Sequence, residues 1–156
     1  MAVMLRRASL GDAEEYLRMQ REAFAGLLEV YQDFETSPAC ETLERVREKL
    51  AQPHRYFYFI EAGGAVVGAI CVVDFHDPAQ RKRVSPLFIL PAFRGRGLAQ
   101  AAMAEAERLH GADRWMLATI LQEKGNCHLY EKMGYHDNGW RQAVNDRMTL
   151  IGYEKD

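Results

Sequence analysis

The sequence predicts a single α/β domain with a mixed central sheet of six to seven strands, two N-terminal helices and two later helices. Three observations predict this fold class. Segments with the apolar spacing of helices alternate with short runs of β-branched and aromatic residues. The composition, 48% hydrophobic and 27% charged, is ordinary for a globular protein. No internal repeat, linker or low-complexity tract interrupts residues 1–156, so one domain is expected.

The first part of the chain is expected to hold a short strand and two helices. The strand covers residues 3–7 and stops where Ser9 and Asp12 have the spacing of a capping box. The first helix has one apolar stripe, formed by Ala13, Leu17, Phe24, Leu28 and Tyr31. Ser37-Pro38 supplies the N-cap and the first-turn proline of the second helix. The inward residues of that helix are Leu43, Val46 and Leu50.

The sheet is expected to continue with a hairpin of residues 56–60 and 65–75, joined by a turn that contains two adjacent glycines. A strand over residues 83–90 follows. It contains Pro86, which cannot donate a hydrogen bond to a neighbouring strand. We therefore expect an edge position or a bulge at this proline.

The last third of the chain is predicted to hold two helices and three strands. The first of these helices starts at Gly97 and stops at Gly111. Residues 115–120 are predicted as a strand, and the next helix spans about residues 123–133. The chain closes with a predicted hairpin, residues 135–140 and 147–153.

The net charge of −2 argues against a nucleic-acid partner, because proteins that bind nucleic acids carry a broad basic surface. Basic residues are nevertheless concentrated in one part of the sequence, at Arg81, Lys82, Arg83, Arg94 and Arg96. Such a region could bind a small polyanion, and a solvated surface is the alternative.

The three cysteines are odd in number and widely spaced, which is typical of free thiols in a reducing cytoplasm. The sequence contains no run of 18 apolar residues, which a membrane-spanning helix would require. The histidines show no spacing typical of a metal site. We therefore expect a soluble cytoplasmic protein with no metal and no membrane partner, and the sequence leaves open whether it forms a homodimer.

A predicted strand enters a predicted helix through Arg-Gly-Arg-Gly-Leu-Ala, residues 94–99, here called the 94–99 loop. The first turn of a helix exposes N–H groups without intrahelical partners and carries a partial positive charge. Gly95 and Gly97 let the backbone approach an anion without a Cβ in the way. The pattern predicts a phosphate site, with a plain tight turn and surface arginines as the alternative.

Two common nucleotide-binding loops do not fit these residues. A P-loop requires Gly-x-x-x-x-Gly-Lys-Ser/Thr, which is absent, and the dinucleotide fingerprint requires a third glycine where this chain has Gln100. What remains is Arg-x-x-Gly-x-Ala, preceded by Ile-Leu-Pro-Ala-Phe and followed at residues 129–135 by Leu-Tyr-Glu-Lys-Met-Gly-Tyr. Both segments resemble motifs of the GNAT superfamily of N-acetyltransferases, in the order in which that family has them.

The resemblance implies a GNAT-like domain in which two central parallel strands splay apart and acetyl-CoA binds in the gap as co-substrate. It assigns cofactor binding to Phe88, Ile89, Leu90, Arg94, Gly95, Arg96, Gly97, Leu98, Ala99 and Asn126. An amine acceptor, either a small molecule or a peptide, would attack the thioester directly. A backbone N–H near Ile89 would stabilise the oxyanion that forms.

Tyr130 is the general acid that the resemblance implies. A phenol with a pKa of about 10 can protonate a thiolate whose acid has a pKa of about 8.5, and a core aromatic is the alternative role. The family's commonest pattern has an Asn seven residues earlier, where this chain has Glu123. Asn126 lies one helical turn before Tyr130 and could take over that contact, or it could merely start the helix.

The strand before the 94–99 loop carries no carboxylate that could act as general base. Asp74 and His76 are the candidates, and a structural role for both is the alternative. The resemblance places an acceptor pocket near the first two helices, where the candidates are Glu22, Tyr31, Asp33 and Glu35. These residues could receive a small cationic amine or form a solvated acidic loop. Two other functions stay open, a non-catalytic CoA-binding regulatory module and a transferase of another acyl-CoA.

Overall fold

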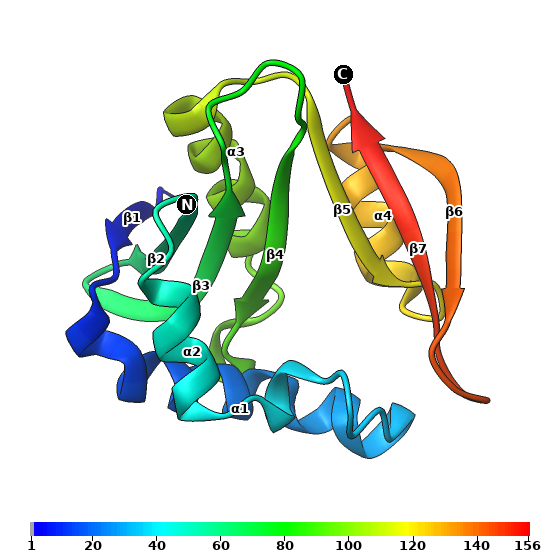
Figure 1. Cartoon of the computed structure of the whole chain (residues 1–156), viewed down its shortest axis with the longest axis horizontal. Coiled ribbons are helices and arrows are strands. Elements are labelled where there is room, and N and C mark those ends of the chain that lie inside the picture. The colour runs from blue at the N-terminus through cyan, green and yellow to red at the C-terminus, as the bar shows by residue number, and fades with distance from the viewer. Residues whose placement is uncertain (1) are drawn as a thin grey trace.

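Within residues 2–156, which the computed structural model describes, seven strands form one mixed sheet in the order β1-β2-β3-β4-β5-β7-β6 (Figure 1). Neighbouring strands are antiparallel except β4 and β5, which are parallel. The strands are β1 (Met4–Arg7), β2 (Arg55–Ala62), β3 (Ala65–Val73), β4 (Lys82–Ile89), β5 (Trp115–Ile120), β6 (His136–Ala143) and β7 (Thr149–Lys155).

The same residues form four α-helices, which are α1 (Ala13–Tyr31), α2 (Leu43–Leu50), α3 (Leu98–His110) and α4 (Lys124–Lys132). The fold class expected from the sequence is confirmed, including the closing hairpin of β6 and β7. Across residues 2–156, none of the helices combines the length and the apolar character that a membrane crossing requires.

The second helix begins later than the sequence predicted. The Ser37 hydroxyl oxygen does accept a hydrogen bond from the Ala39 N–H at 3.1 Å, but the turn that it caps is a short 3-10 helix, Pro38–Cys40. Glu41 then returns to an extended conformation, and the Thr42 side chain caps α2. Two caps in succession therefore divide what the sequence predicted as one helix.

The helices cover the two faces of the sheet separately (Figure 1). One buried cluster joins α1 and α2 to one face, and its sheet residues include Phe57, Phe59, Cys71 and Phe88. A second buried cluster joins α3 and α4 to the other face, and its members include Ile70, Ile89, Leu98 and Tyr130. The 94–99 loop therefore leads into the helical layer on one side, and the α1–α2 connection lies on the other.

Gly68 of β3 brings that strand very close to β4. A Cβ built at this position would lie 2.1 Å from the Phe88 carbonyl oxygen. Because the clashing atom belongs to the backbone, Gly68→Ala must displace β4, and we expect it to lower the free energy of unfolding by about 1–3 kcal/mol.

Gly26 of α1 provides the matched control, because no described atom lies within 4 Å of a Cβ added there. Gly26→Ala is expected to raise the free energy of unfolding by about 0.5–1 kcal/mol, since alanine favours the helix interior. Chemical denaturation measures both variants. A Gly68→Ala protein as stable as the wild type would contradict the close approach of the two strands.

Candidate functional site

The parallel strands β4 and β5 separate soon after they begin. They pair at Lys82 with Trp115 and at Arg83 with Met116, and the described residues show no further pairing between them. Figure 1 shows the two strands diverging toward their C-terminal ends, where β4 leads into the 94–99 loop. The splayed central strands that the sequence predicted are confirmed.

A bulge in β4 marks the point of separation. The register of β3 against β4 shifts between Ile70 and Val72, so that Ser85 and Pro86 together oppose a single residue of β3. Because proline cannot donate to a ladder, the bulge accommodates it without an unsatisfied position in the sheet. Of the two arrangements that the sequence allowed, the structure has the bulge.

The backbone of Ile89 faces the gap between β4 and β5. The N–H of its neighbour Leu90 donates to the Val67 carbonyl of β3 at 2.8 Å. Successive residues of an antiparallel strand direct their hydrogen bonds to opposite sides, so the Ile89 N–H and C=O point toward β5. The Ile89 oxygen accepts a hydrogen bond from Arg94 Nε at 3.0 Å. The Ile89 N–H is therefore a donor that the gap offers to a ligand.

The 94–99 loop starts α3 in a conformation that requires glycine. Gly95 and Gly97 have φ angles of 79° and 73°, which residues with a side chain rarely adopt. Gly97 is the N-cap, and the Ala101 N–H donates to its carbonyl at 3.1 Å. The N–H groups of residues 98–100 therefore have no partner within the helix and lie at its positive end. This arrangement is typical of a phosphate site.

The two arginines of the 94–99 loop have different surroundings. Arg94 holds the loop in place, because besides its bond to Ile89 its Nη2 donates to the Ala23 carbonyl of α1 at 2.7 Å. Arg96 is exposed, and its guanidinium carbon lies 5.8 Å from the centre of the Phe93 ring. Arg96 is thus the arginine whose charge is available to an anion.

The basic residues that lie close together in the sequence do not form one surface. Arg81 binds the carboxylates of Glu154 and Asp156 at 3.0 and 2.5 Å, and Lys82 donates to a backbone carbonyl between α3 and β5 at 2.8 Å. These contacts lie where β4 begins, whereas the 94–99 loop follows the other end of this eight-residue strand. A polyanion site shared by all five basic residues is therefore a wrong expectation.

Tyr130 lies on the face of α4 that packs against the sheet. Its ring centre is 6.1 Å from that of Tyr135, and it belongs to the same buried cluster as Ile89 and Leu98. Burial, and to a smaller extent the Cys127 thiol, raise the pKa of Tyr130 to about 12. A phenol that keeps its proton at neutral pH therefore lies in the cluster that connects the gap to the 94–99 loop.

Glu123 makes a contact that sequence reasoning did not assign to it. It is the N-cap residue of α4, so Asn126 is an exposed residue of the first turn and does not start the helix. The Tyr31 hydroxyl donates to Glu123 Oε2 at 2.5 Å. Burial, followed by this hydrogen bond, raises the pKa of Tyr31 to about 12. The end of α1 is thereby joined to the corner between β5 and α4.

Two further bonds hold the end of α1 against the C-terminal half of the chain. Asn145 Nδ2 donates to the Tyr31 carbonyl at 2.9 Å, and Arg147 Nη1 donates to the Val30 carbonyl at 3.3 Å. Together with the Tyr31–Glu123 bond they bridge the two parts of the splayed sheet. The only sequence signal for this bridge was a glutamate at position 123, where the family commonly has asparagine.

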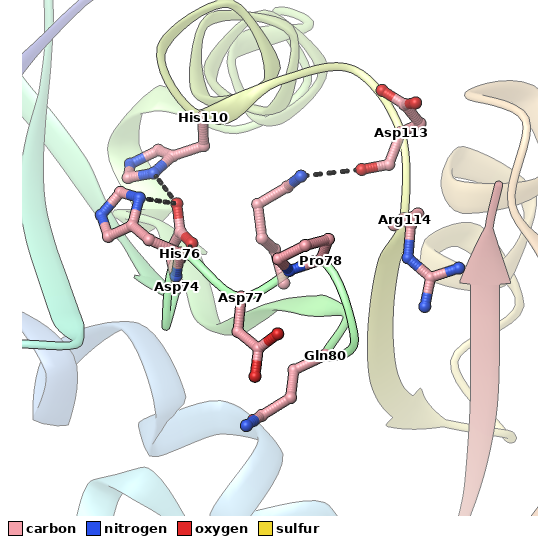
Figure 2. Close-up of a pocket in the computed structure, with 9 residues that line it drawn as sticks. Asp74, His76, Asp77, Pro78, Gln80, His110, Asp113 and Arg114 are labelled. Atoms are coloured by element: carbon pink, nitrogen blue, oxygen red, sulfur yellow. Dashed lines mark hydrogen bonds and ion pairs between the residues drawn. The ribbon is translucent and has the colours of Figure 1, made fainter.

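Asp74 and His76, the candidate general bases, lie near the start of β4 and not beside the 94–99 loop. Figure 2 shows the Asp74 carboxylate between two histidines: Nδ1 of His110 lies 2.8 Å from Asp74 Oδ2, and Nδ1 of His76 lies 3.7 Å from it. Nε2 of His110 is bonded to the Tyr58 hydroxyl at 2.8 Å. Asp74 and both histidines line a pocket of about 250 Å³, which is separate from the gap beyond the bulge.

The Asp74 carboxylate should stabilise the fold in a pH-dependent way. Burial opposes its ionised form, but hydrogen bonds from His110 and from the His76 N–H outweigh burial and lower its pKa. A carboxyl with a lowered folded pKa stabilises the fold above its ordinary pKa of 3.8, and this contribution is lost as the pH falls through the folded value.

Asp74→Asn is therefore expected to lower the free energy of unfolding by about 1–3 kcal/mol at neutral pH. The deficit should shrink when the pH is lowered from neutral to below the ordinary pKa of 3.8, because the wild type loses this contribution as the pH falls through the lowered pKa of Asp74. Urea denaturation at the two pH values measures it. A deficit that is the same at both would contradict the role of the charge.

The acidic candidates for the acceptor site do not gather in one place. Glu22 is exposed on α1, and the Asp33 carboxylate accepts a hydrogen bond from Thr36 Oγ1 at 3.2 Å in the turn after α1. Glu35 lines a pocket of about 440 Å³ between the α1–α2 connection, α2 and the bulge of β4, here called the α2 pocket. The α2 pocket is also lined by Gln20, Glu41, Arg45, Lys49, Arg55, Ser85 and Pro86. An open space with both acidic and basic walls therefore lies where β4 leaves β5.

Comparison with known proteins gives one family and many solved structures. The model of the acetyltransferase (GNAT) family matches residues 24–135. No curated protein matches the sequence. The chain is similar to the crystal structure of an acetyltransferase from Thermus thermophilus, with 20% identity and a TM-score of 0.71, over 98% of this chain and 96% of that one.

Two other similar structures were solved with coenzyme A. One is the PaiA N-acetyltransferase from Thermoplasma acidophilum, with 16% identity and a TM-score of 0.72 over 100% of both chains. The other is the spermidine N-acetyltransferase from Vibrio cholerae in complex with CoA and spermine, with 16% identity and a TM-score of 0.75 over 97% of this chain and 93% of that one. At these identities the likeness establishes a shared fold.

Proposed function

Because the chain belongs to the acetyltransferase (GNAT) family, we propose that it transfers the acetyl group of acetyl-CoA to a small amine by direct attack on the thioester. The observation that carries this proposal is the splay of β4 and β5 directly before the 94–99 loop. An unpaired strand edge and a phosphate-binding helix start follow one another there. An elongated co-substrate with a pyrophosphate at one end and an amide-containing arm requires this combination.

The residues of the gap fit acetyl-CoA along its length. The N–H groups of residues 98–100 and the Arg96 guanidinium would hold the pyrophosphate. The pantetheine arm would lie along the segment from Leu90 back to Phe88, where the Ile89 N–H faces the gap. Asn126 would reach the arm from α4. The thioester would then lie toward the bulge of β4, next to the α2 pocket.

The proposed chemistry requires one hydrogen-bond donor and one acid from the protein. The amine nitrogen attacks the thioester carbonyl, and the Ile89 N–H donates to the oxygen as it becomes negative. The C–S bond then breaks, and Tyr130 donates its proton to the leaving sulfur. The attacking amine loses its surplus proton to water, because Asp74 and His76 line a separate pocket near the start of β4. Tyr130 regains a proton from solvent.

The test combines acetyl-CoA with a panel of amines and quantifies the free thiol and the acetylated amine together. One acetylated amine for each thiol released is the expected result. Binding of CoA without transfer to any amine would favour a non-catalytic regulatory module. Transfer from only a different acyl-CoA would indicate an acyltransferase that uses another acyl donor.

We still predict a cytoplasmic enzyme that acts on a small-molecule or peptide amine and binds neither nucleic acid nor membranes.

A further inference from the structure

The α2 pocket contains one ion pair that is balanced within the protein. Both carboxylate oxygens of Glu41 are used, Oε1 by Gln20 Nε2 at 2.9 Å and Oε2 by Lys49 Nζ at 2.5 Å. Arg45 lies 3.6 Å from Glu48 on the exposed surface of α2. The charges of Glu41 and Lys49 therefore cancel, and what the pocket offers to a ligand depends on its other residues.

Arg55 is a half-buried cation of the α2 pocket that has no carboxylate partner among the described residues. Its Nε donates to the amide oxygen of Gln52 at 2.6 Å, which does not neutralise the charge. Glu35, the remaining carboxylate of the pocket, is exposed to solvent. Holding a partly desolvated guanidinium without a counter-charge costs free energy, and a bound anion would remove that cost.

A second arginine lies in the same row of the sheet. Arg55 pairs with Val73 across β2 and β3, and Val73 pairs with Arg83 across β3 and β4. Directly opposite residues project to the same face of a sheet, and Phe57, two residues after Arg55, belongs to the cluster under α1 and α2. The two arginines therefore flank Val73 on the face of the α2 pocket.

The Arg83 side chain also contains an atom that lacks a hydrogen-bond partner. Its Nε is buried and has no hydrogen-bond partner within residues 2–156. It precedes Ser85, a lining residue of the α2 pocket at the bulge of β4, by two positions on the same strand. Of these two arginines without carboxylate partners among the described residues, Arg55 lines the α2 pocket and Arg83 lies in the same row of the sheet.

We propose that the acceptor is an amine that also carries a carboxylate, such as a free amino acid, and that Arg55 binds this carboxylate. The inference rests on the proposed acetyl transfer: the amine faces the bulge of β4 while the carboxylate points toward Arg55, with Arg83 adding positive potential. A guanidinium binds a carboxylate through two parallel hydrogen bonds, which would also orient the amine. In place of the purely cationic acceptor expected from the acidic residues after α1, this proposal gives an acceptor that carries a carboxylate as well as an amine.

Matched pairs of acceptors, an amino acid and its carboxamide, test the charge when kcat/KM is expressed per neutral amine, because the carboxamide lacks the carboxylate and its amine is less basic. We expect kcat/KM for the acid to exceed that for the amide by about tenfold or more. Arg55→Gln should lower kcat/KM for the acid by about 10- to 100-fold and leave the amide nearly unchanged. Arg55→Lys should restore part of the loss. Arg47→Gln, at an exposed arginine of α2 outside the pocket, should change neither.

A wild-type enzyme that prefers the amide to the acid, or a polyamine to both, would overturn the proposal. An Arg55→Gln loss that is equal for acid and amide would also overturn it. Calorimetric binding of the acid to the CoA-loaded protein separates this inference from the proposed function. Arg55-dependent binding without transfer would support the anion site and contradict acetyl transfer. Transfer that does not depend on Arg55 would support acetyl transfer and contradict the anion site.

Discussion

Tyr130→Phe is expected to lower kcat by about a hundredfold or more, with little change in the Kd for acetyl-CoA. The substitution removes the hydroxyl that would protonate the leaving thiolate and keeps the ring, which packs in the cluster with Ile89 and Leu98. The fold should therefore remain intact. The rate of thiol release in the presence of an amine, together with calorimetric binding of acetyl-CoA, measures both quantities.

The raised pKa of Tyr130 also predicts how kcat depends on pH. With a pKa of about 12, the phenol stays protonated throughout the usual assay range. Loss of the acid should therefore not limit kcat below about pH 10.

Tyr135→Phe is the control for this experiment. The Tyr135 hydroxyl is buried and has no hydrogen-bond partner within the described residues, and its ring lies beside that of Tyr130. Its removal should leave kcat unchanged. Equal losses in the two variants would indicate a packing effect, and full activity of Tyr130→Phe would remove Tyr130 from the mechanism.

Gly97→Ala should raise the Kd for CoA by about tenfold or more. An alanine in the left-handed region costs about 1–2 kcal/mol, so the 94–99 loop should leave the conformation with a φ of 73°. The N–H groups of residues 98–100 would then no longer point together at the pyrophosphate. The added methyl meets no atom within 4 Å in the structure, so the expected effect comes from the backbone conformation and not from a clash. Calorimetric titration with CoA measures the change in Kd.

Gly111→Ala separates loss of the phosphate site from loss of stability. Gly111 ends the same helix with a φ of 101°, so alanine is strained there as well. It lies at the other end of α3 from the 94–99 loop. The variant should be less stable and should keep the wild-type Kd for CoA in its folded form. A Gly97→Ala protein that binds CoA as the wild type does would contradict the assignment of the loop.

Local patterns in the sequence predicted most of the fold, because each depends on residues that are neighbours in the chain. Pro86 required a bulge or an edge, and the glycines of the 94–99 loop required positive φ angles at a helix start. The identification as an acyl-CoA-dependent N-acetyltransferase is confirmed at the level of the family. The start of α2 was predicted wrongly, because the caps at Ser37 and Thr42 lie within one short segment and either can begin a helix.

Local sequence patterns could not predict contacts between segments that are distant in the chain. Tyr31 and Glu123 are 92 residues apart, and only the fold brings the end of α1 to the start of α4. The row of Arg55 and Arg83 depends on the register of three strands. Acidic residues after α1 were predicted to form the acceptor site from their composition. In the structure Glu35 lines the α2 pocket together with basic residues, and an acidic acceptor site stays a prediction.

The structure of the complex with CoA tests the central claim most directly. The pyrophosphate is predicted to accept hydrogen bonds from the N–H groups of residues 98–100, with the arm along Ile89 and the sulfur within hydrogen-bond reach of the Tyr130 hydroxyl. A pyrophosphate bound elsewhere, for example at the pocket of Asp74 and His110, would contradict the account, as would a sulfur that lies far from Tyr130.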